Sequence, residues 1–260
     1  MSATVPVPSP GELFLLRDHA AVVTGASSGL GARFTRLLAG AGAEVYAVAR
    51  RAEKLTEVTA GLPNVVTVVA DISSPEGRQR VLTELGNRGA TPDILINNAG
   101  TSGPLSAFDE NGEEFSRVLG VNLTSAYALT RDVVMSAEDP SGMRVINVSS
   151  ILGLVSGAPV GGAGYAASKA GLIGLTRELA GQWGRRGVRV NALAPGWFPS
   201  EMTTELLADE SSTKWVARNS MLGRAGREGE LDTAVMFLAS PYSSYLTGQV
   251  IAVDGGWTAR

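Results

Sequence analysis

The sequence passes from a short apolar run into an amphipathic stretch at Thr24-Gly25-Ala26-Ser27-Ser28-Gly29-Leu30-Gly31. Three glycines at such a junction allow a tight turn and a close approach of the backbone to a ligand. The helix expected next offers unpaired N–H groups and the positive end of its dipole, which together favour a pyrophosphate. A plain glycine-rich turn is the alternative, because the spacing is Gly-x-x-x-Gly-x-Gly rather than the commoner Gly-x-Gly-x-x-Gly.

On both sides of this stretch, runs rich in Val, Ile and Ala alternate with longer amphipathic segments. Such near-continuous apolar runs are typical of strands buried on both faces. Their alternation with helices predicts a single-domain, doubly wound α/β fold, with seven parallel strands and helices on both faces. The predicted strands are Ala20–Thr24, Glu44–Ala49, Val65–Ala70, Asp93–Asn97, Arg144–Ser149, Arg189–Ala194 and Gln249–Val253. The predicted helices are Leu30–Ala41, Pro75–Arg88, Glu110–Ser136, Tyr165–Arg186 and Glu228–Ala239.

We expect one domain over residues 1–260. The long irregular stretch at about 197–226 is predicted to be a lid, because long connections in compact domains are often functional. The Pro-rich residues 1–16 are expected to be flexible. Neither a signal-peptide core nor an apolar stretch of membrane-spanning length is evident, so a cytoplasmic location is expected.

Composition narrows the classes of ligand. The chain has 22 Lys and Arg against 25 Asp and Glu, a formal net charge of −3, which argues against binding to nucleic acid or an anionic membrane. The absence of Cys excludes disulfides and thiolate chemistry, and one histidine, His19, excludes a His-rich metal site. A small-molecule substrate and no metal are therefore expected.

The second predicted strand ends in Val48-Ala49-Arg50-Arg51, without an acidic residue at its tip. An Asp or Glu there would hold a free ribose 2′-hydroxyl, whereas Arg suits a 2′-phosphate. We therefore predict NADP(H) over NAD(H); two solvated arginines at a helix start are the alternative. Asp71-Ile72 ends the third strand, where Asp71 could accept from an adenine amino group and Ile72 could flank the ring. A helix N-cap is the other interpretation of Asp71.

Tyr165 and Lys169 stand four residues apart, which places both on one helix face. A free tyrosine has a pKa of about 10, and a nearby ammonium would lower it and allow proton exchange with a substrate oxygen. Taken alone, such a pair is more often an ordinary surface feature. Here it opens a helix rich in Ala and Gly and follows a buried strand that ends in Ser149-Ser150.

Taken together, these motifs resemble the short-chain dehydrogenase/reductase family, in its shorter single-domain branch with a Rossmann-type sheet. The resemblance covers the chain from about His19 to Trp257. It rests on Thr24–Gly31, Asp71, Asn97-Asn98-Ala99-Gly100, Asn122, Ser149-Ser150, Tyr165, Lys169, Pro195-Gly196 and Val253-Asp254-Gly255-Gly256.

The resemblance implies four catalytic residues. Tyr165 would be the acid/base, and Lys169 would bind the nicotinamide ribose and lower the Tyr165 pKa. Ser150 would hydrogen-bond the substrate oxygen; it is preferred to Ser149 because two apolar residues and Gly153 follow it. Asn122 would lie in a kinked helix and order a water that links Lys169 to solvent, although an ordinary helix hydrogen bond is the alternative.

The binding residues follow from the same motifs. The candidate cofactor contacts are Gly25, Ser27, Ser28, Gly29, Leu30, Gly31, Arg50, Arg51, Asp71, Ile72, Asn98, Ala99, Gly100, Tyr165, Lys169, Pro195, Gly196, Phe198 and Ser200. The candidate substrate contacts are Ser150, Leu152, Tyr165, Trp197 and Met202. One departure from the family is that Tyr165 follows Ser150 by 15 positions, two more than usual, through a Gly-rich stretch expected to border the substrate pocket.

The predicted activity is NADP(H)-dependent interconversion of a ketone and a secondary alcohol by hydride transfer. An NAD(H)-dependent polyol or gluconate dehydrogenase and a non-catalytic NADP-binding regulator are the alternatives. A dehydratase or epimerase of the related longer fold would need a larger C-terminal substrate domain. The resemblance also implies a homodimer or homotetramer, with contacts from Val253–Trp257 and the small-residue face of Tyr165–Gly181.

Overall fold

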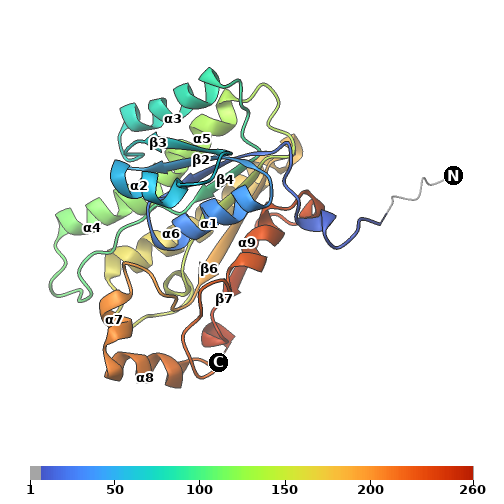
Figure 1. The fold of residues 1–260 in the computed structure, drawn as a ribbon. Coiled ribbons are helices and arrows are strands. Elements are labelled where there is room, and N and C mark those ends of the chain that lie inside the picture. Colours follow the sequence, from blue (N-terminus) through green and yellow to red (C-terminus); the bar gives the residue numbers. More distant parts are fainter. Residues whose placement is uncertain (1–6, 260) are drawn as a thin grey trace.

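Seven parallel strands form one sheet in the order β3-β2-β1-β4-β5-β6-β7 (Figure 1). The computed structural model describes residues 7–259. The strands are β1 Ala20–Thr24, β2 Glu44–Ala49, β3 Val65–Val69, β4 Ile94–Asn97, β5 Arg144–Val148, β6 Arg189–Pro195 and β7 Val250–Val253. Every predicted strand is present to within one residue at each end, and the predicted doubly wound α/β fold is confirmed.

The helices are α1 Gly29–Gly40, α2 Ala52–Thr59, α3 Pro75–Asn87, α4 Gly112–Leu119, α5 Ser125–Ser136, α6 Ala163–Trp183, α7 Thr204–Ala208, α8 Glu210–Asn219 and α9 Asp232–Ala239. Of these helices, α2, α7 and α8 were not predicted from the sequence. The first and last of these carry many polar residues, and α7 spans little more than one turn, so their apolar periodicity is weak.

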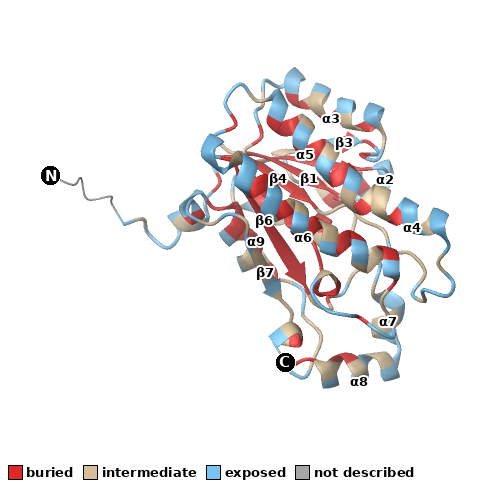
Figure 2. Ribbon diagram, turned by 180° about the vertical axis from the view of Figure 1, so that it is seen from behind, coloured by how far each residue is buried: buried red, intermediate tan, exposed pale blue. Residues whose placement is uncertain are grey.

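Helices cover both faces of the sheet, and alternate residues of β1 face the two layers. Ala21 and Val23 pack in a buried cluster with α1 and α9, whereas Ala20 and Val22 pack in another with α3, α5 and α6. Figure 2 shows the buried strands between more exposed outer helix faces. Because complete burial of one large apolar side chain stabilises a fold by about 1.5–3 kcal/mol, these two layers hold the sheet together.

The predicted helix Glu110–Ser136 is wrong at its centre. The structure breaks it into α4, a π-helical turn over Gly120–Thr124, and α5. The Asn122 side chain in this turn accepts from the Thr101 amide at 2.8 Å and donates to the Thr101 carbonyl at 3.0 Å. A hydrophobic pattern does not reveal such a turn, because the widened turn is fixed by contacts with a distant loop.

The predicted lid contains α7 and α8 and lies over the carboxyl end of the sheet (Figure 1). Within the predicted flexible segment, residues 1–6 lie outside the described residues. Leu16, at its other end, is buried, and its amide donates to the Ala41 carbonyl at 2.9 Å, so this end of the segment is packed. Across residues 7–259, no helix is both long and apolar enough to cross a bilayer.

The strand order reverses between β1 and β4, because β2 and β3 lie on one side of β1 and the later strands lie on the other. At such a point the connections after the two strands diverge to opposite faces, which leaves a crevice at the carboxyl edge of the sheet. Functional residues are therefore expected at this edge.

Candidate functional site

A cleft of about 310 Å³ occupies the carboxyl edge beside β1 and β4. Its walls come from the ends of β1, β2, β3 and β4 and from the start of the lid. Thirteen of the candidate cofactor residues line it: Gly25, Ser27, Ser28, Gly29, Leu30, Arg50, Arg51, Asp71, Ile72, Asn98, Ala99, Gly100 and Ser200.

Two glycines at the base of this cleft allow close packing of the backbone. Gly25 has φ of +68°, and a Cβ there would lie 2.8 Å from Asn98 Nδ2. A Cβ on Gly31 would overlap the Gly25 carbonyl oxygen. Gly25 thus permits a left-handed turn, and Gly31 permits α1 to pack against it. The chain fits a dinucleotide here because its backbone can approach a pyrophosphate at the start of α1.

Hydrogen bonds join the residues at the carboxyl end of β1 to those at the carboxyl end of β4. Thr24 Oγ1 accepts from the amides of Asn98 and Ala99, both at 3.0 Å. The Asn98 side chain in turn donates to the Thr24 carbonyl at 3.0 Å. The ends of β1 and β4 therefore form one rigid wall of the cleft.

A cationic cluster lies at the far end of the cleft. The Arg51 guanidinium donates to Ser27 Oγ at 3.1 Å and to Ser28 Oγ at 2.8 Å. Arg51 and Lys54 both bind the carboxylate of Glu201, at 2.9 and 2.6 Å. Hydrogen bonds from Arg51 and then Lys54 lower the pKa of Glu201 to about 2. The Glu201 carboxylate is thus a stand-in anion, and its donors are of the kind that bind phosphate.

Arg50 is oriented differently from Arg51. It is largely exposed and lies 3.9 Å from the Asp71 carboxylate. Asp71 also accepts from the Ser73 hydroxyl at 2.7 Å, a hydrogen bond that lowers the pKa of Asp71. The N-cap of α3 is Ser74, so the N-cap interpretation of Asp71 is wrong.

The serine, tyrosine and lysine of the sequence motif meet beside this cleft. Ser150 follows β5, and Tyr165 and Lys169 lie in the first turns of α6. Lys169 Nζ lies 5.5 Å from the centre of the Tyr165 ring and donates to the Val148 carbonyl at 2.8 Å. The two additional residues between Ser150 and Tyr165 leave this geometry intact.

Burial decides the acidity of these groups. It raises the pKa of Tyr165, whereas a hydrogen bond with the Ser150 side chain lowers that pKa by less. Burial lowers the pKa of Lys169 to about 8. The lowered Tyr165 pKa expected from the sequence is therefore not found in the chain alone, because desolvation of the phenolate outweighs the neighbouring groups.

The neighbouring polar residues are held by hydrogen bonds within the protein. Ser149 Oγ donates to the Lys169 carbonyl at 2.8 Å, whereas Ser150 lines a cavity. Besides its contacts with Thr101, Asn122 donates to Ser168 Oγ at 2.9 Å. Ser149 and Asn122 thus connect α6 to the sheet and to the loop after β4.

A second cavity, of about 100 Å³, opens onto Tyr165 and Ser150. All five candidate substrate residues line it. Val160 and Gly162 of the Gly-rich stretch also line it, as the sequence analysis expected. Gly196, which was predicted as a cofactor contact, also lines it. The lining residues that sequence reasoning missed are Ser102, Gly103, Leu105, Ile151 and Thr203.

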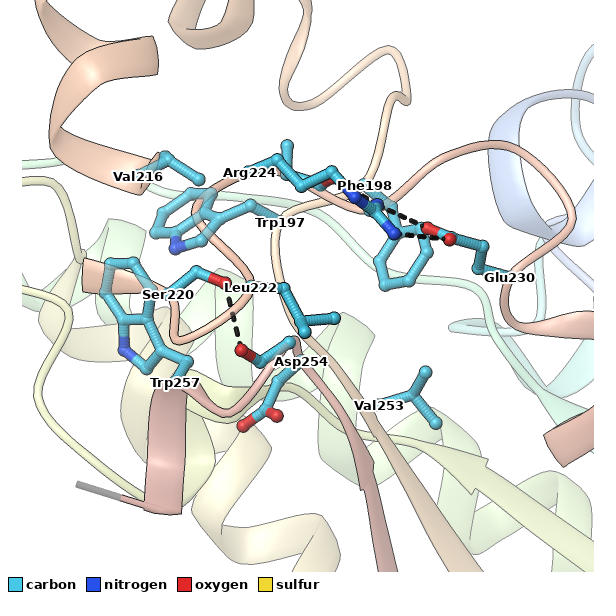
Figure 3. Close-up of a pocket in the computed structure, with 13 residues that line it drawn as sticks. Trp197, Phe198, Val216, Ser220, Leu222, Arg224, Glu230, Val253, Asp254 and Trp257 are labelled. Atoms are coloured by element: carbon cyan, nitrogen blue, oxygen red, sulfur yellow. Dashed lines mark hydrogen bonds and ion pairs between the residues drawn. The ribbon is translucent and has the colours of Figure 1, made fainter. Parts of the chain in front are cut away.

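Trp197 lines this cavity and also a third one, of about 170 Å³, which Figure 3 shows. Its ring packs edge-on against Trp215 at 5.7 Å and Trp257 at 5.9 Å between centroids. The Arg224–Glu230 ion pair, at 2.7 Å, borders the same space. Edge-on aromatic pairs contribute about 0.5–1.5 kcal/mol each beyond their burial, so this cluster fixes one wall of the substrate cavity.

Four candidate cofactor residues lie elsewhere. Gly31 packs beneath the cleft, and Gly196 lines the substrate cavity. The Phe198 ring is buried and lines the third cavity, with Gly226 against it. Pro195 ends β6, where it is buried. Sequence reasoning missed Lys54 and its partner Glu201. Their contact joins positions 147 residues apart, and no sequence motif relates residues that are so distant.

The comparisons with known proteins agree with this architecture. A family model described as enoyl-(acyl carrier protein) reductase matches residues 25–258. The 3-oxoacyl-(acyl-carrier-protein) reductase FabG of Rickettsia prowazekii is 36% identical over 93% of this chain and 97% of its own.

Two solved structures superpose closely. A gluconate 5-dehydrogenase from Burkholderia cenocepacia, in complex with NADP and tartrate, has a TM-score of 0.90 and 29% identity, covering 97% of this chain and all of its own. A short-chain type dehydrogenase/reductase from Mycobacterium marinum has a TM-score of 0.89 and 30% identity over 96% and 99% of the two chains. With the family model matching most of its length, the chain belongs to the short-chain dehydrogenase/reductase family of oxidoreductases, as its sequence predicts.

Proposed function

We propose that this oxidoreductase interconverts a ketone and a secondary alcohol with NADP(H), and that Tyr165 is its acid/base. The observation that carries the proposal is that Ser150 and Tyr165 line a small cavity beside the dinucleotide cleft, with Lys169 Nζ 5.5 Å from the centre of the Tyr165 ring. The Burkholderia relative, whose structure holds NADP, supports the choice of cofactor. So does the cationic cluster of Arg51 and Lys54, with the Ser28 hydroxyl beside it.

Each residue has a distinct task in this proposal. The Tyr165 hydroxyl gives a proton to the substrate oxygen in reduction and takes it back in oxidation. Ser150 donates a hydrogen bond to the same oxygen and stabilises the charge that develops there. Lys169 holds a positive charge near the phenol, and Asn122 steadies the turn beside it. Bound NADP(H) supplies the hydride chemistry and, when oxidised, a positive charge that favours the phenolate.

The substrate cavity favours a mainly apolar ketone or alcohol. The large apolar residues that line it are Leu105, Ile151, Leu152, Val160, Trp197 and Met202. The predominance of apolar side chains with a few polar groups is typical of sites that bind such ligands. A polyol or gluconate dehydrogenase is the second candidate, because the superposed Burkholderia enzyme is a gluconate 5-dehydrogenase.

A panel of carbonyl compounds tests this proposal. Cyclic and aliphatic ketones, 3-oxoacyl thioesters and keto-gluconates are offered with NADPH or NADH, and the matching alcohols with NADP⁺ or NAD⁺. We expect NADPH oxidation with a subset of the ketones, at a kcat/KM at least about tenfold above that with NADH. A consistent preference for NADH would contradict the cofactor assignment, and turnover of keto-gluconates alone would favour the second candidate.

The Arg51→Ala variant locates the origin of the preference. Removal of a charged hydrogen-bond donor from a phosphate costs about 1.5–3 kcal/mol, so kcat/KM with NADPH should fall about 10- to 100-fold. Activity with NADH in the same variant is the internal control and should change little. Equal losses with both cofactors would mean that Arg51 does not recognise the phosphate.

We also propose that the chain assembles into a homodimer or homotetramer. A Cβ at Gly174 or Gly181 of α6 would meet no atom within 4 Å, so this small-residue face is open to a partner. Trp257, in contrast, is buried within its own chain. We therefore expect fewer subunit contacts from the segment Val253–Trp257 than the sequence suggested. Light scattering should give two or four times the chain mass of 26.9 kDa, and a single-chain mass would contradict the assembly.

A further inference from the structure

Two acidic side chains among residues 7–259 line the dinucleotide cleft: Asp71 lies beside Arg50, and Glu201 lies beside Arg51 and Lys54. One carboxylate oxygen of Glu201 accepts from Ser28 Oγ and from Arg51, both at 2.9 Å. The other accepts from Lys54 Nζ at 2.6 Å and from Arg51 at 3.2 Å. Both cations and Glu201 are about half-exposed, so a dissolved anion can reach them.

We propose that Glu201 is a cofactor-specificity residue, whose carboxylate competes with the 2′-phosphate of NADP(H) for Arg51 and Lys54. The inference rests on the proposed use of NADP(H). A carboxylate and a phosphate present similar oxygens to a guanidinium, and only one can make these hydrogen bonds at a time. Two anions a few ångströms apart also repel each other, so Glu201 has to withdraw when the phosphate binds.

The contact of Glu201 with Arg51 and Lys54 couples the phosphate site to the wall of the substrate cavity. Glu201 follows Ser200 at the start of the lid, and the next two residues, Met202 and Thr203, line the substrate cavity. Phe198, three residues earlier, is buried and anchors the segment. Displacement of Glu201 therefore loosens residues 201–208, whereas NAD(H), which lacks the 2′-phosphate, leaves the Glu201 contacts in place.

Calorimetry with two nucleotide fragments measures this competition. Wild type, Glu201→Gln and Glu205→Gln are titrated with 2′,5′-ADP and with 5′-AMP at low ionic strength, because salt screens exposed ion pairs. Glu205 is an exposed acid of α7 for which no contact with Arg51 or Lys54 is found among residues 7–259, so it controls for charge. We expect Glu201→Gln to bind 2′,5′-ADP about three- to tenfold more tightly than the other two proteins, with unchanged 5′-AMP affinity.

The outcomes separate this inference from the proposed function. Equal 2′,5′-ADP affinities in all three proteins, each tighter than for 5′-AMP, would overturn the competition and leave the NADP(H) assignment standing. No preference for 2′,5′-ADP over 5′-AMP in any of them would overturn both.

Hydrogen exchange supplies a second readout. In wild type, 2′,5′-ADP should speed amide exchange in residues 201–208 and 5′-AMP should not, while in Glu201→Gln the exchange should be fast from the start. Slower exchange of this segment in wild type with 2′,5′-ADP would contradict the release of Glu201.

Discussion

Tyr165→Phe should lower kcat by about 10²- to 10⁴-fold and leave the affinity for NADPH unchanged. The substitution removes only the hydroxyl, while the ring keeps its place in the cavity wall. Ser150 Oγ still accepts from the Leu152 amide at 3.1 Å, so the fold around the site is preserved. Steady-state kinetics with the best ketone of the panel and fluorescence titration with NADPH measure the two effects.

Tyr245→Phe is the matched control, because that side chain is fully exposed. It removes one hydroxyl from the surface and should leave kcat at its wild-type value. If Tyr165→Phe also kept the wild-type kcat, the proton would have to come from another group, and the mechanism proposed for this site would be wrong.

Lys169→Met should abolish most of the activity and make the stability of the protein less dependent on pH. Lys169 is 4% exposed, and its burial lowers the pKa of the ammonium to about 8 from an ordinary 10.5. Below pH 8 the group is charged in both the folded and the unfolded state, and the cost of burying the charge is present in full. Above pH 10.5 it is neutral in both states, and this cost is absent.

Between these values the unfolded chain binds more protons than the folded one, so stability rises with pH. The free energy of unfolding of wild type should rise by up to about 3 kcal/mol relative to Lys169→Met across this window, since each pKa unit is worth about 1.4 kcal/mol. Urea denaturation at pH 7, 9 and 10.5 measures the difference. Lys214→Met removes a largely exposed ammonium and controls for the loss of one charge. If the free energy of unfolding changed with pH equally in wild type and Lys169→Met, burial of the charged amine would carry no such cost in stability.

Much of the fold could be predicted because it depends on local patterns. The seven strands are short runs whose residues are apolar on both faces, and burial on both faces is what a parallel sheet between two helical layers requires. The glycines between β1 and α1 could be assigned because a residue with a Cβ would overlap its neighbours at Gly25 and Gly31. The break at Gly120–Thr124 could not, because Asn122 holds it through contacts with a distant loop.

By itself, the sequence determined the family, the order of the strands along the chain, and the pairing of Tyr165 with Lys169, since each is written in residues close together or in short motifs. Only the tertiary structure decided the rest. It placed Glu201 between Arg51 and Lys54, about 150 positions away in the chain, and it buried the Phe198 ring in the core. It also raised the pKa of Tyr165 where the motif alone implied a lower one, because desolvation depends on every atom packed around the phenol and not on the one lysine a helical turn away.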